Sequence, residues 1–336
     1  MSNTMQVALI NHYKQKELDL KTVPIPKMQP NDILVKIVAA SINPIDLKMM
    51  NGDLKLLLNS TMPLILGNDF VGIVDKIGVN VTRFKVGDKV YGRPDKNRIG
   101  TFAEYIAVNE NDVALKPKNL NYNEAAAIPL VGLTSYQALH DFMHIKPNQK
   151  VLIQAGSGGV GTIAIQIAKQ LGAYVATTTS HKNFELVKSL GADKIIDYHE
   201  ESLSEVLNDY DAVFDTIGGK SLEESFKIVK PGGHIVSVSG IPDVGFAKNY
   251  GLAKWKQIVL KIATHKLSKL EQQTQVKYNF LFMEPNGYEL SLLTQLIEDE
   301  KLHPIIDRTF KLEDINKALD YSRAGHAKGK IIITMN

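Results

Sequence analysis

The sequence predicts an α/β protein with two parts, a doubly wound parallel sheet and a second, β-rich domain. Two observations carry this prediction. The apolar run 150–153 leads directly into glycines spaced G-x-G-x-x-G, and an apolar stripe at helical spacing follows in residues 162–171. Strand-like runs then alternate with helical segments, whereas the residues before Glu124 form short β-rich runs separated by turns.

Length and composition agree with two globular domains. The chain has 336 residues, of which 44% are hydrophobic, and this exceeds what one core usually serves. Its 39 basic and 36 acidic residues give a net charge of +3 without long blocks of one sign, so we expect no nucleic-acid partner. The lysine-rich stretch 254–269 is interpreted as the solvated side of a helix.

Two further features bear on location and on thiol chemistry. No apolar run reaches the ~18 residues of a membrane span, and the first ten residues lack the pattern of a secretory signal. We therefore expect a cytoplasmic protein without membrane insertion. The absence of cysteine excludes disulfides, thiolate nucleophiles and zinc sites built from cysteine.

The glycine turn is the strongest functional motif. Free backbone N–H groups at the start of a helix, with no side chains in the way, suit the pyrophosphate of a dinucleotide. We therefore predict dinucleotide binding, the alternative being a glycine-rich turn that holds no ligand. The predicted binding residues of the turn are Gly156, Ser157, Gly158, Gly159, Val160 and Gly161.

The hydrophobic pattern predicts the remaining elements. In the nucleotide-binding part we expect strands at 174–178, 194–196, 212–215 and 234–238, and helices at 184–190 and 221–229. In the first part we expect strands at 33–42, 70–77, 89–91 and 102–108, with little helical pattern. The tail contains two helical patterns, 289–300 and 312–323, and a last strand, 330–334. It is too short to stand alone, so we expect it to complete the first domain.

The end of the strand after the glycine helix predicts the choice of cofactor. Folds that bind NAD usually carry Asp or Glu there to hold the ribose hydroxyls. Residues 177–182 are instead Thr, Thr, Thr, Ser, His and Lys, with no acid to repel a 2′-phosphate. We therefore predict NADPH, held by Thr179, Ser180 and Lys182; the alternative is that the threonine run reflects β-propensity alone.

A set of short motifs recurs in order along nearly the whole chain. In the first half they are AASINPIDLK (39–48), GNDFVG (67–72), VGDKV (86–90) and GTFAEY (100–105). In the second half they are AAIPLVGLTSY (126–136), the glycine turn, GAD (191–193), VFD (213–215) and GG (232–233). In this ordered spacing the chain resembles the zinc-independent quinone oxidoreductase branch of the medium-chain dehydrogenase/reductase superfamily.

The resemblance implies a GroES-like catalytic domain built from residues 1–123 and 285–336, and a Rossmann domain at 124–284 that binds NADPH. It also implies that Lys182 and Tyr198 contact the 2′-phosphate, and we place Lys328 among the cofactor-binding residues as well. A homodimer is implied too, in which the strand-like segment 278–283 extends the sheet into a second copy.

The positions that hold the catalytic zinc in other branches of the superfamily carry Asn43, Asn68 with Asp69, and Leu130 here. Zinc needs three ligands of thiolate, imidazole or carboxylate type, so we predict no metal. Hydride transfer without a Lewis acid favours acceptors whose carbonyl needs only hydrogen-bond polarisation, such as quinones and conjugated enones. A second metal candidate, His140 with His144 at helical spacing, lacks a carboxylate motif and is interpreted as a helix surface.

The predicted function is NADPH-dependent reduction of a quinone, or of a similar conjugated carbonyl compound, by a metal-free enzyme. The predicted catalytic residues are Asn43, Asp46 and Thr134, and the resemblance implies that Asn43 and Thr134 position the substrate or the nicotinamide. Either Lys48 or water donates the proton.

Three alternatives remain open. One is an NADPH-dependent 2-alkenal or enone reductase, and another is a sensor that binds NADPH without turnover. The third is a short-chain reductase, because Ser237, Tyr250 and Lys254 imitate its Ser-Tyr-Lys arrangement. That class begins with its glycine turn, however, and leaves no room for the β-rich residues that come first here.

Overall fold

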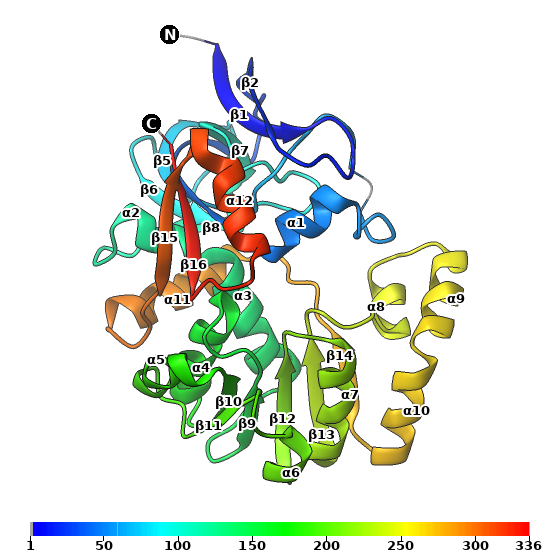
Figure 1. Ribbon diagram of the computed structural model, residues 1–336. Helices are drawn as coiled ribbons and strands as arrows, with labels where there is room; N and C mark the ends of the chain where they lie inside the picture. Colours follow the sequence, from blue (N-terminus) through cyan, green and yellow to red (C-terminus); the bar gives the residue numbers. More distant parts are fainter. Residues whose placement is uncertain (1–2, 59, 336) are drawn as a thin grey trace. The chain divides into compact units, whose positions relative to one another are not determined.

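A computed structural model describes residues 3–58 and 60–335 of the chain. They form two compact units, one containing the chain up to Leu133 and again from Glu284, the other containing Thr134–Met283. Each unit has its own main sheet. Figure 1 shows the elements of both.

The second unit holds a six-stranded sheet in the order β11-β10-β9-β12-β13-β14, and all its neighbouring pairs are parallel. The first strand of the unit therefore lies inside the sheet, with the next two strands on one side and the following three on the other. This confirms the doubly wound parallel sheet. The strands are β9 (Lys150–Ile153), β10 (Tyr174–Thr179), β11 (Lys194–Asp197), β12 (Tyr210–Asp215), β13 (Val229–Ser237) and β14 (Lys277–Phe280).

Helices connect these strands, as right-handed crossovers between parallel strands require. They are α4 (Gly159–Gln170), α5 (Phe184–Ser189), α6 (Leu203–Val206), α7 (Gly219–Ile228), α8 (Val244–Asn249), α9 (Lys254–Ala263) and α10 (His265–Thr274). Helix α3 (Pro129–Tyr136) runs across the boundary between the units and continues as a π-helix, Gln137–Phe142.

The first unit is mainly antiparallel. Its larger sheet has the order β15-β16-β3-β5-β6-β8 with β7 also paired to β3, and a smaller sheet has the order β2-β1-β4. The alternating apolar side chains of β3, β5 and β7 fill its core, among them Ile33, Phe70 and Ile106. The strands are β1 (Thr4–Ile10), β2 (Asp19–Pro24), β3 (Asp32–Ile42), β4 (Leu64–Ile65), β5 (Asp69–Ile77), β6 (Lys89–Gly92), β7 (Tyr105–Asn109), β8 (Val113–Leu115), β15 (Ile306–Lys311) and β16 (Lys330–Thr334).

The tail joins this first unit through its last strand. Strand β16 pairs antiparallel with β3, so that Ile331 lies opposite Ile42 and Thr334 lies opposite Ala39. The pairing brings the start of β16 to the end of β3, where the first helix begins. The helices of this unit are α1 (Pro44–Asn51), α2 (Tyr122–Ala126), α11 (Gly287–Glu298) and α12 (Ile315–Arg323).

Several elements of the first unit escape the sequence pattern. The pattern does not predict helix α1, because its two turns are too few to show a periodic stripe. It does not identify strands β1, β2 and β15 either, and the strand expected at 102–108 begins only at Tyr105. In the described part of the chain, no helix combines the length and apolar character needed to cross a bilayer.

Candidate active site

The glycine turn lies where the order of the parallel sheet reverses. It follows β9, whose two neighbours are β10 and β12, and it leads into α4 with Gly158 as the N-cap residue. Crevices at this edge of such sheets are the usual place for a nucleotide, because the first N–H groups of the helix lack intrahelical partners. In this structure Ala155 turns the chain with a φ of 51°, and its carbonyl accepts the Gly158 N–H at 3.0 Å.

The glycines of the turn differ in what they are needed for. A Cβ on Gly156 would lie 2.1 Å from Thr177 Oγ1, and a Cβ on Gly161 would lie 2.3 Å from the Ala155 carbonyl oxygen. Both positions therefore need glycine for the fold itself. A Cβ on Gly158 would meet only the Ala155 oxygen, at 3.3 Å, a slightly tight contact. The fold therefore requires glycine less strictly at 158 than at 156 and 161, whereas a phosphate that approaches the helix start needs the missing side chain.

Polar side chains surround the end of β10. Thr179 Oγ1 donates to Ser157 Oγ at 2.9 Å, and Asn183 Nδ2 donates to the same oxygen at 3.1 Å and to Ser180 Oγ at 3.2 Å. Asn183 is buried, yet its Oδ1 has no hydrogen-bond partner. Since buried acceptors are normally satisfied, this oxygen fits a ligand hydroxyl. Sequence reasoning missed Asn183, whose place after the Thr-Ser run was the available signal.

An acidic side chain also reaches this strand end. Asp197, the last residue of β11, accepts the His181 N–H at 2.9 Å and the His199 N–H at 3.0 Å. The sequence indicates no acid at the end of β10 itself, and it does not reveal this one because the acid comes from the neighbouring strand. Lys182 and Tyr198 follow the ends of β10 and β11 and are both exposed, Tyr198 by 57%. Backbone N–H groups bind the Asp197 carboxylate, whereas Lys182 and Tyr198 lie at the surface.

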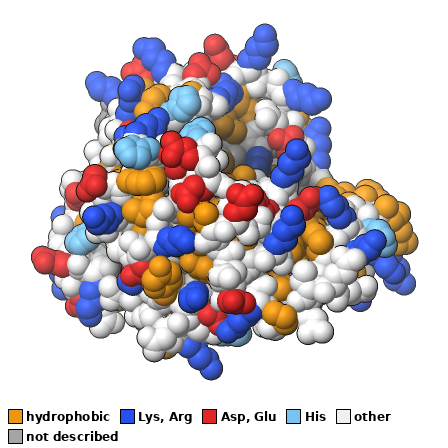
Figure 2. Space-filling model, turned by 60° about the horizontal axis from the view of Figure 1, so that its bottom comes forward, with side chains coloured by type: hydrophobic (Ala, Val, Ile, Leu, Met, Phe, Trp, Pro, Cys, Tyr) orange, Lys and Arg blue, Asp and Glu red, His pale blue; other side chains and the backbone are white. Residues whose placement is uncertain are grey.

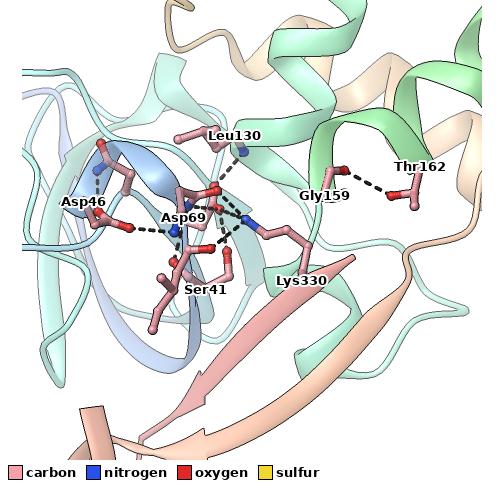
Figure 3. A network of polar contacts seen from close by, with 10 residues as sticks. Ser41, Asp46, Asp69, Leu130, Gly159, Thr162 and Lys330 are labelled. Carbon is pink, nitrogen blue, oxygen red and sulfur yellow. Dashed lines mark hydrogen bonds and ion pairs between the residues drawn. The ribbon is translucent and has the colours of Figure 1, made fainter. Parts of the chain in front are cut away.

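The other members of the turn make contacts within the unit. Thr162 Oγ1 donates to the Gly159 carbonyl at 3.1 Å, and Ser135 Oγ donates to the Val160 carbonyl at 3.3 Å. Figure 3 shows the first of these bonds at the start of α4. Thr134 is buried on α3 next to Ser135.

The first unit contains a buried polar network centred on Asp69 (Figure 3). Asp69 Oδ2 accepts Ser41 Oγ at 2.5 Å and Asn43 Nδ2 at 2.8 Å. Its Oδ1 accepts the Leu130 N–H at 2.6 Å. The fourth donor is Lys330, whose Nζ lies 3.2 Å from Oδ2. All these polar side chains are at most 4% exposed, so the network forms in a medium of low dielectric.

Lys330 comes from the tail, and sequence reasoning missed it. Its Nζ donates to Asn43 Oδ1 and to the Ile42 carbonyl as well as to Asp69. Burial lowers the pKa of Lys330, while the Asp69 carboxylate opposes that change. A lysine at the head of the apolar run IIIT was the available signal, since lysine is almost never buried without a partner.

Asn43 and Asp46 lie at the start of α1, where both are buried. Asp46 Oδ2 accepts the Asn43 N–H at 2.8 Å, and Asp46 Oδ1 accepts Asn68 Nδ2 at 2.7 Å. The side-chain amide of Asn43 is itself engaged by Asp69, Ser41 and Lys330. Both residues therefore hold the loop and helix in place, and a ligand would meet them through the backbone that they fix.

Burial raises the pKa of Asp46 to about 7, and the nearby Asp69 carboxylate adds to that rise. Between its unfolded value near 3.8 and about 7, the folded chain keeps a proton that the unfolded chain releases. We therefore expect the free energy of unfolding to fall as pH rises through this window, by up to ~1.4 kcal/mol per pH unit. Denaturant titrations of the wild type and of Asp46→Asn across this window measure the effect.

Asp46→Asn is a well-matched variant, because its neighbour Asn68 has a buried Oδ1 without a hydrogen-bond partner. Once turned, the Asn68 amide can accept a hydrogen bond from the amide group that the substitution introduces. Asp46→Asn should flatten the dependence on pH in this window. Equal slopes in the two proteins would show that Asp46 is ionised in the folded chain at low pH.

The residues at the zinc-ligand positions do not fit a zinc ion. Asn43 and Asn68 offer neutral amides, Leu130 offers only its backbone, and the one carboxylate, Asp69, is already bound by four donors. The ammonium group of Lys330 stands against that carboxylate, where a second cation would be repelled. Among the described residues no group of three His, Asp or Glu side chains is placed to bind a metal.

The remaining sequence candidates are His140 with His144, Lys328, and Ser237. His140 pairs with Asp141 at 2.6 Å, and His144 reaches back to the His140 carbonyl at 2.9 Å. Lys328 is exposed in the loop before β16. Ser237 Oγ donates to the buried Asp215 carboxylate, which accounts for this serine without a short-chain reductase site.

Two protein-family models match the chain. Residues 29–118 match the alcohol dehydrogenase GroES-like domain, and residues 190–333 match the zinc-binding dehydrogenase family.

Proteins with related sequences and structures carry oxidoreductase names. The 2-methylene-furan-3-one reductase of Solanum lycopersicum is 34% identical over 321 residues, which cover 93% of this chain and 74% of that protein. The chloroplastic NADPH-dependent alkenal/one oxidoreductase of Arabidopsis thaliana is 32% identical over the same shares of the two chains, 93% and 74%. The structure of the quinone oxidoreductase from Coxiella burnetii aligns with a TM-score of 0.84 and 34% identity, covering 99% of this chain and 100% of that one.

Proposed function

Because the chain belongs to the quinone oxidoreductases of the medium-chain dehydrogenase/reductase superfamily, we propose that it reduces a quinone or a similar conjugated carbonyl compound with NADPH and without a metal. The observation that carries the proposal is the glycine turn at the reversal of the parallel sheet, where a Cβ on Gly158 would meet a single protein atom within 4 Å but would obstruct a phosphate at the helix start. A 2-alkenal or enone is the second candidate acceptor, supported by the names of the two plant relatives.

The residues of the second unit suit a dinucleotide. The N–H groups at the start of α4 would bind the pyrophosphate, and the unpartnered Asn183 Oδ1 would accept from a ribose hydroxyl. When bound, the nicotinamide supplies the hydride that reduces the acceptor. Thr134 is proposed to position the ring or the substrate.

NADPH is proposed rather than NADH because a cation and hydroxyls border the end of β10. Lys182 and Tyr198 are exposed there, and Ser180 is half-buried. The acid at the end of the neighbouring strand, Asp197, has both oxygens engaged by backbone N–H groups, so it repels a 2′-phosphate less than a free carboxylate would.

Lys182→Glu is therefore expected to raise the KM for NADPH by about tenfold or more and to change the KM for NADH little, because it reverses the charge that meets the 2′-phosphate. Steady-state rates with both coenzymes measure this. Lys188→Glu, which reverses another exposed lysine on the helix that follows, is the matched control. If the two variants behave alike with NADPH, Lys182 does not hold the phosphate.

The network around Asp69 is proposed to take the place of a metal site. It fixes Asn43 and the start of α1, and Asp46 holds the same helix start from its other side. The donors of the network are occupied by Asp69, so its proposed part is to hold this backbone rigid; polarisation of the acceptor carbonyl falls to other hydrogen-bond donors, and for conjugated acceptors hydrogen bonds alone are enough. Lys48 or water donates the final proton.

The proposed reaction is tested by mixing the purified protein with NADPH and a panel of quinones, 2-alkenals and saturated ketones while the nicotinamide absorbance is followed. We expect turnover with quinones or enones that survives treatment with a chelator. Tight NADPH binding without turnover on any acceptor would instead identify a sensor. Loss of activity with the chelator and recovery with zinc would overturn the metal-free mechanism.

We also propose a homodimer that forms at the free edge strand β14, which lies last in the sheet order. Light scattering after gel filtration tests whether the protein is a dimer.

A cytoplasmic location is proposed as well, and cell fractionation with a high-salt wash tests the location.

A further inference from the structure

Helix α9 turns its apolar side toward the solvent. Trp255, Ile258, Val259 and Ile262 are 59%, 60%, 46% and 72% exposed. At about 100° per residue these four side chains form one stripe roughly 100° wide. The one buried residue of the helix, Leu260, lies on nearly the opposite side. This arrangement is the reverse of an ordinary surface helix, which hides its apolar stripe and exposes its polar face.

The surroundings of this stripe are strongly basic. Residues 244–270 contain six lysines and no aspartate or glutamate, although the whole chain has a net charge of only +3. On the helix, Lys254 and Lys261 border the stripe on one side and Lys256 borders it on the other. An acid that faces this region from α7 is Glu223, which pairs with Lys266 at 2.5 Å. Residues 244–270 themselves therefore offer no acidic side chain to Lys254 and Lys261, the two lysines on one side of the stripe.

Figure 2 shows hydrophobic side chains gathered at the right edge of the view, with Lys or Arg and a His beside them. Figure 1 places α9 on that side, and the two views differ only by a turn about the horizontal axis. Contiguous exposed apolar patches rimmed by polar residues are typical of binding surfaces.

We propose that α9 docks the protein onto an anionic lipid bilayer, lying flat at the membrane surface without crossing it. The stripe of Trp255, Ile258 and Ile262 would enter the boundary between headgroups and acyl chains, and the bordering lysines would meet the lipid phosphates. The combination of tryptophan, branched aliphatic residues and flanking lysines is the pattern of interfacial helices. The sequence alone indicates that the stretch 254–269 is the solvated side of a helix. The structure shows that this stretch also exposes an apolar stripe to the solvent.

The charge of the surface favours this occupant over a second copy of the chain. A two-fold contact would place the same surface against itself and bring its lysines close to the lysines of the second copy. Like charges at an apolar contact are costly to bury. An acidic protein would satisfy the lysines and could bind Trp255, but lysine is depleted at protein interfaces relative to the rest of the surface.

Trp255 is the only tryptophan of the chain, so its fluorescence reports directly on this helix. The full-length protein is titrated with vesicles of phosphatidylglycerol and, separately, of phosphatidylcholine. We expect the emission of Trp255 to shift to shorter wavelengths and the protein to sediment with phosphatidylglycerol vesicles only, and we expect high salt to weaken both effects.

Matched variants separate the contribution of the apolar area from the contribution of the positive charge. Ile258→Gln with Ile262→Gln, which removes apolar area, and Lys254→Glu with Lys261→Glu, which reverses the charge, should each weaken binding by about tenfold or more. Val79→Gln with Val86→Gln, which changes exposed valines of the first unit, should leave binding unchanged. Thermal melts confirm that each variant is folded.

Three outcomes would overturn the proposal. One is the absence of binding to phosphatidylglycerol vesicles, and another is equal binding by the α9 variants. The third is a shift of Trp255 emission that depends on protein concentration without vesicles, together with a dimer that Ile258→Gln and Ile262→Gln dissociate. Binding is measured without turnover, so the result does not depend on the proposed reaction.

Discussion

Replacing Lys330 with methionine is expected to lower the free energy of unfolding by about 3–5 kcal/mol, the largest stability effect we expect from a single exchange in this chain. Methionine keeps the length of the side chain but removes the ammonium group. The Asp69 carboxylate would then remain buried with only neutral donors, and Asn43 Oδ1 would lose its donor as well. A buried charge without its partner costs far more than the intact pair contributes. Chemical denaturation followed by circular dichroism measures the change.

Two variants make the result specific. Lys328→Met removes an exposed lysine two residues earlier and should change the stability by no more than about 0.5 kcal/mol. Asp69→Asn combined with Lys330→Met removes both charges and should recover a large part of the loss, because no isolated charge is left in the interior. Equal midpoints for Lys330→Met and Lys328→Met would mean that the pair does not form.

Replacing Gly158 with alanine is expected to weaken NADPH binding by about tenfold or more while leaving the melting temperature nearly unchanged. The added methyl group meets one protein atom, the Ala155 oxygen at 3.3 Å, so the fold tolerates it. It projects at the helix start where the pyrophosphate is proposed to lie, so the coenzyme cannot approach as closely. Fluorescence titration with NADPH and a thermal melt of the same sample measure both quantities.

Gly156→Ala provides the contrast. Its Cβ would lie 2.1 Å from Thr177 Oγ1, so strain of about 1–3 kcal/mol should appear in the melt before any ligand is added. The two variants thereby distinguish a glycine kept for the fold from one kept for a ligand. If Gly158→Ala binds NADPH as the wild type does, the coenzyme does not lie against this turn.

The nucleotide-binding unit could be predicted largely from the sequence because its signals are local. Strand β9, the glycine turn and α4 follow one another within residues 150–170, and each is encoded by spacing that a short window reveals. The polar run at the end of β10 could be predicted from the sequence in the same way. The presence of Asp197 at this edge could not, because the neighbouring strand brings it there, and which strands become neighbours is a property of the whole sheet.

The interior of the first unit shows the opposite case. Lys330 and Asp69 are separated by 261 positions, and no local pattern relates them. The antiparallel pairing of β16 with β3 brings the lysine to the buried carboxylate, and burial in turn makes the pair strong and raises the pKa of Asp46. Without that pairing, each of these groups looks like an ordinary surface charge.

The sequence by itself determined the class of fold and the position of the glycine turn, because these depend on residue types at short spacing. Only the tertiary structure decided which charges are buried together and which way α9 faces. An amphipathic helix has the same sequence pattern whether its apolar stripe packs against a core or meets the solvent. What distinguishes the two is the set of neighbours, and the folded chain alone supplies those.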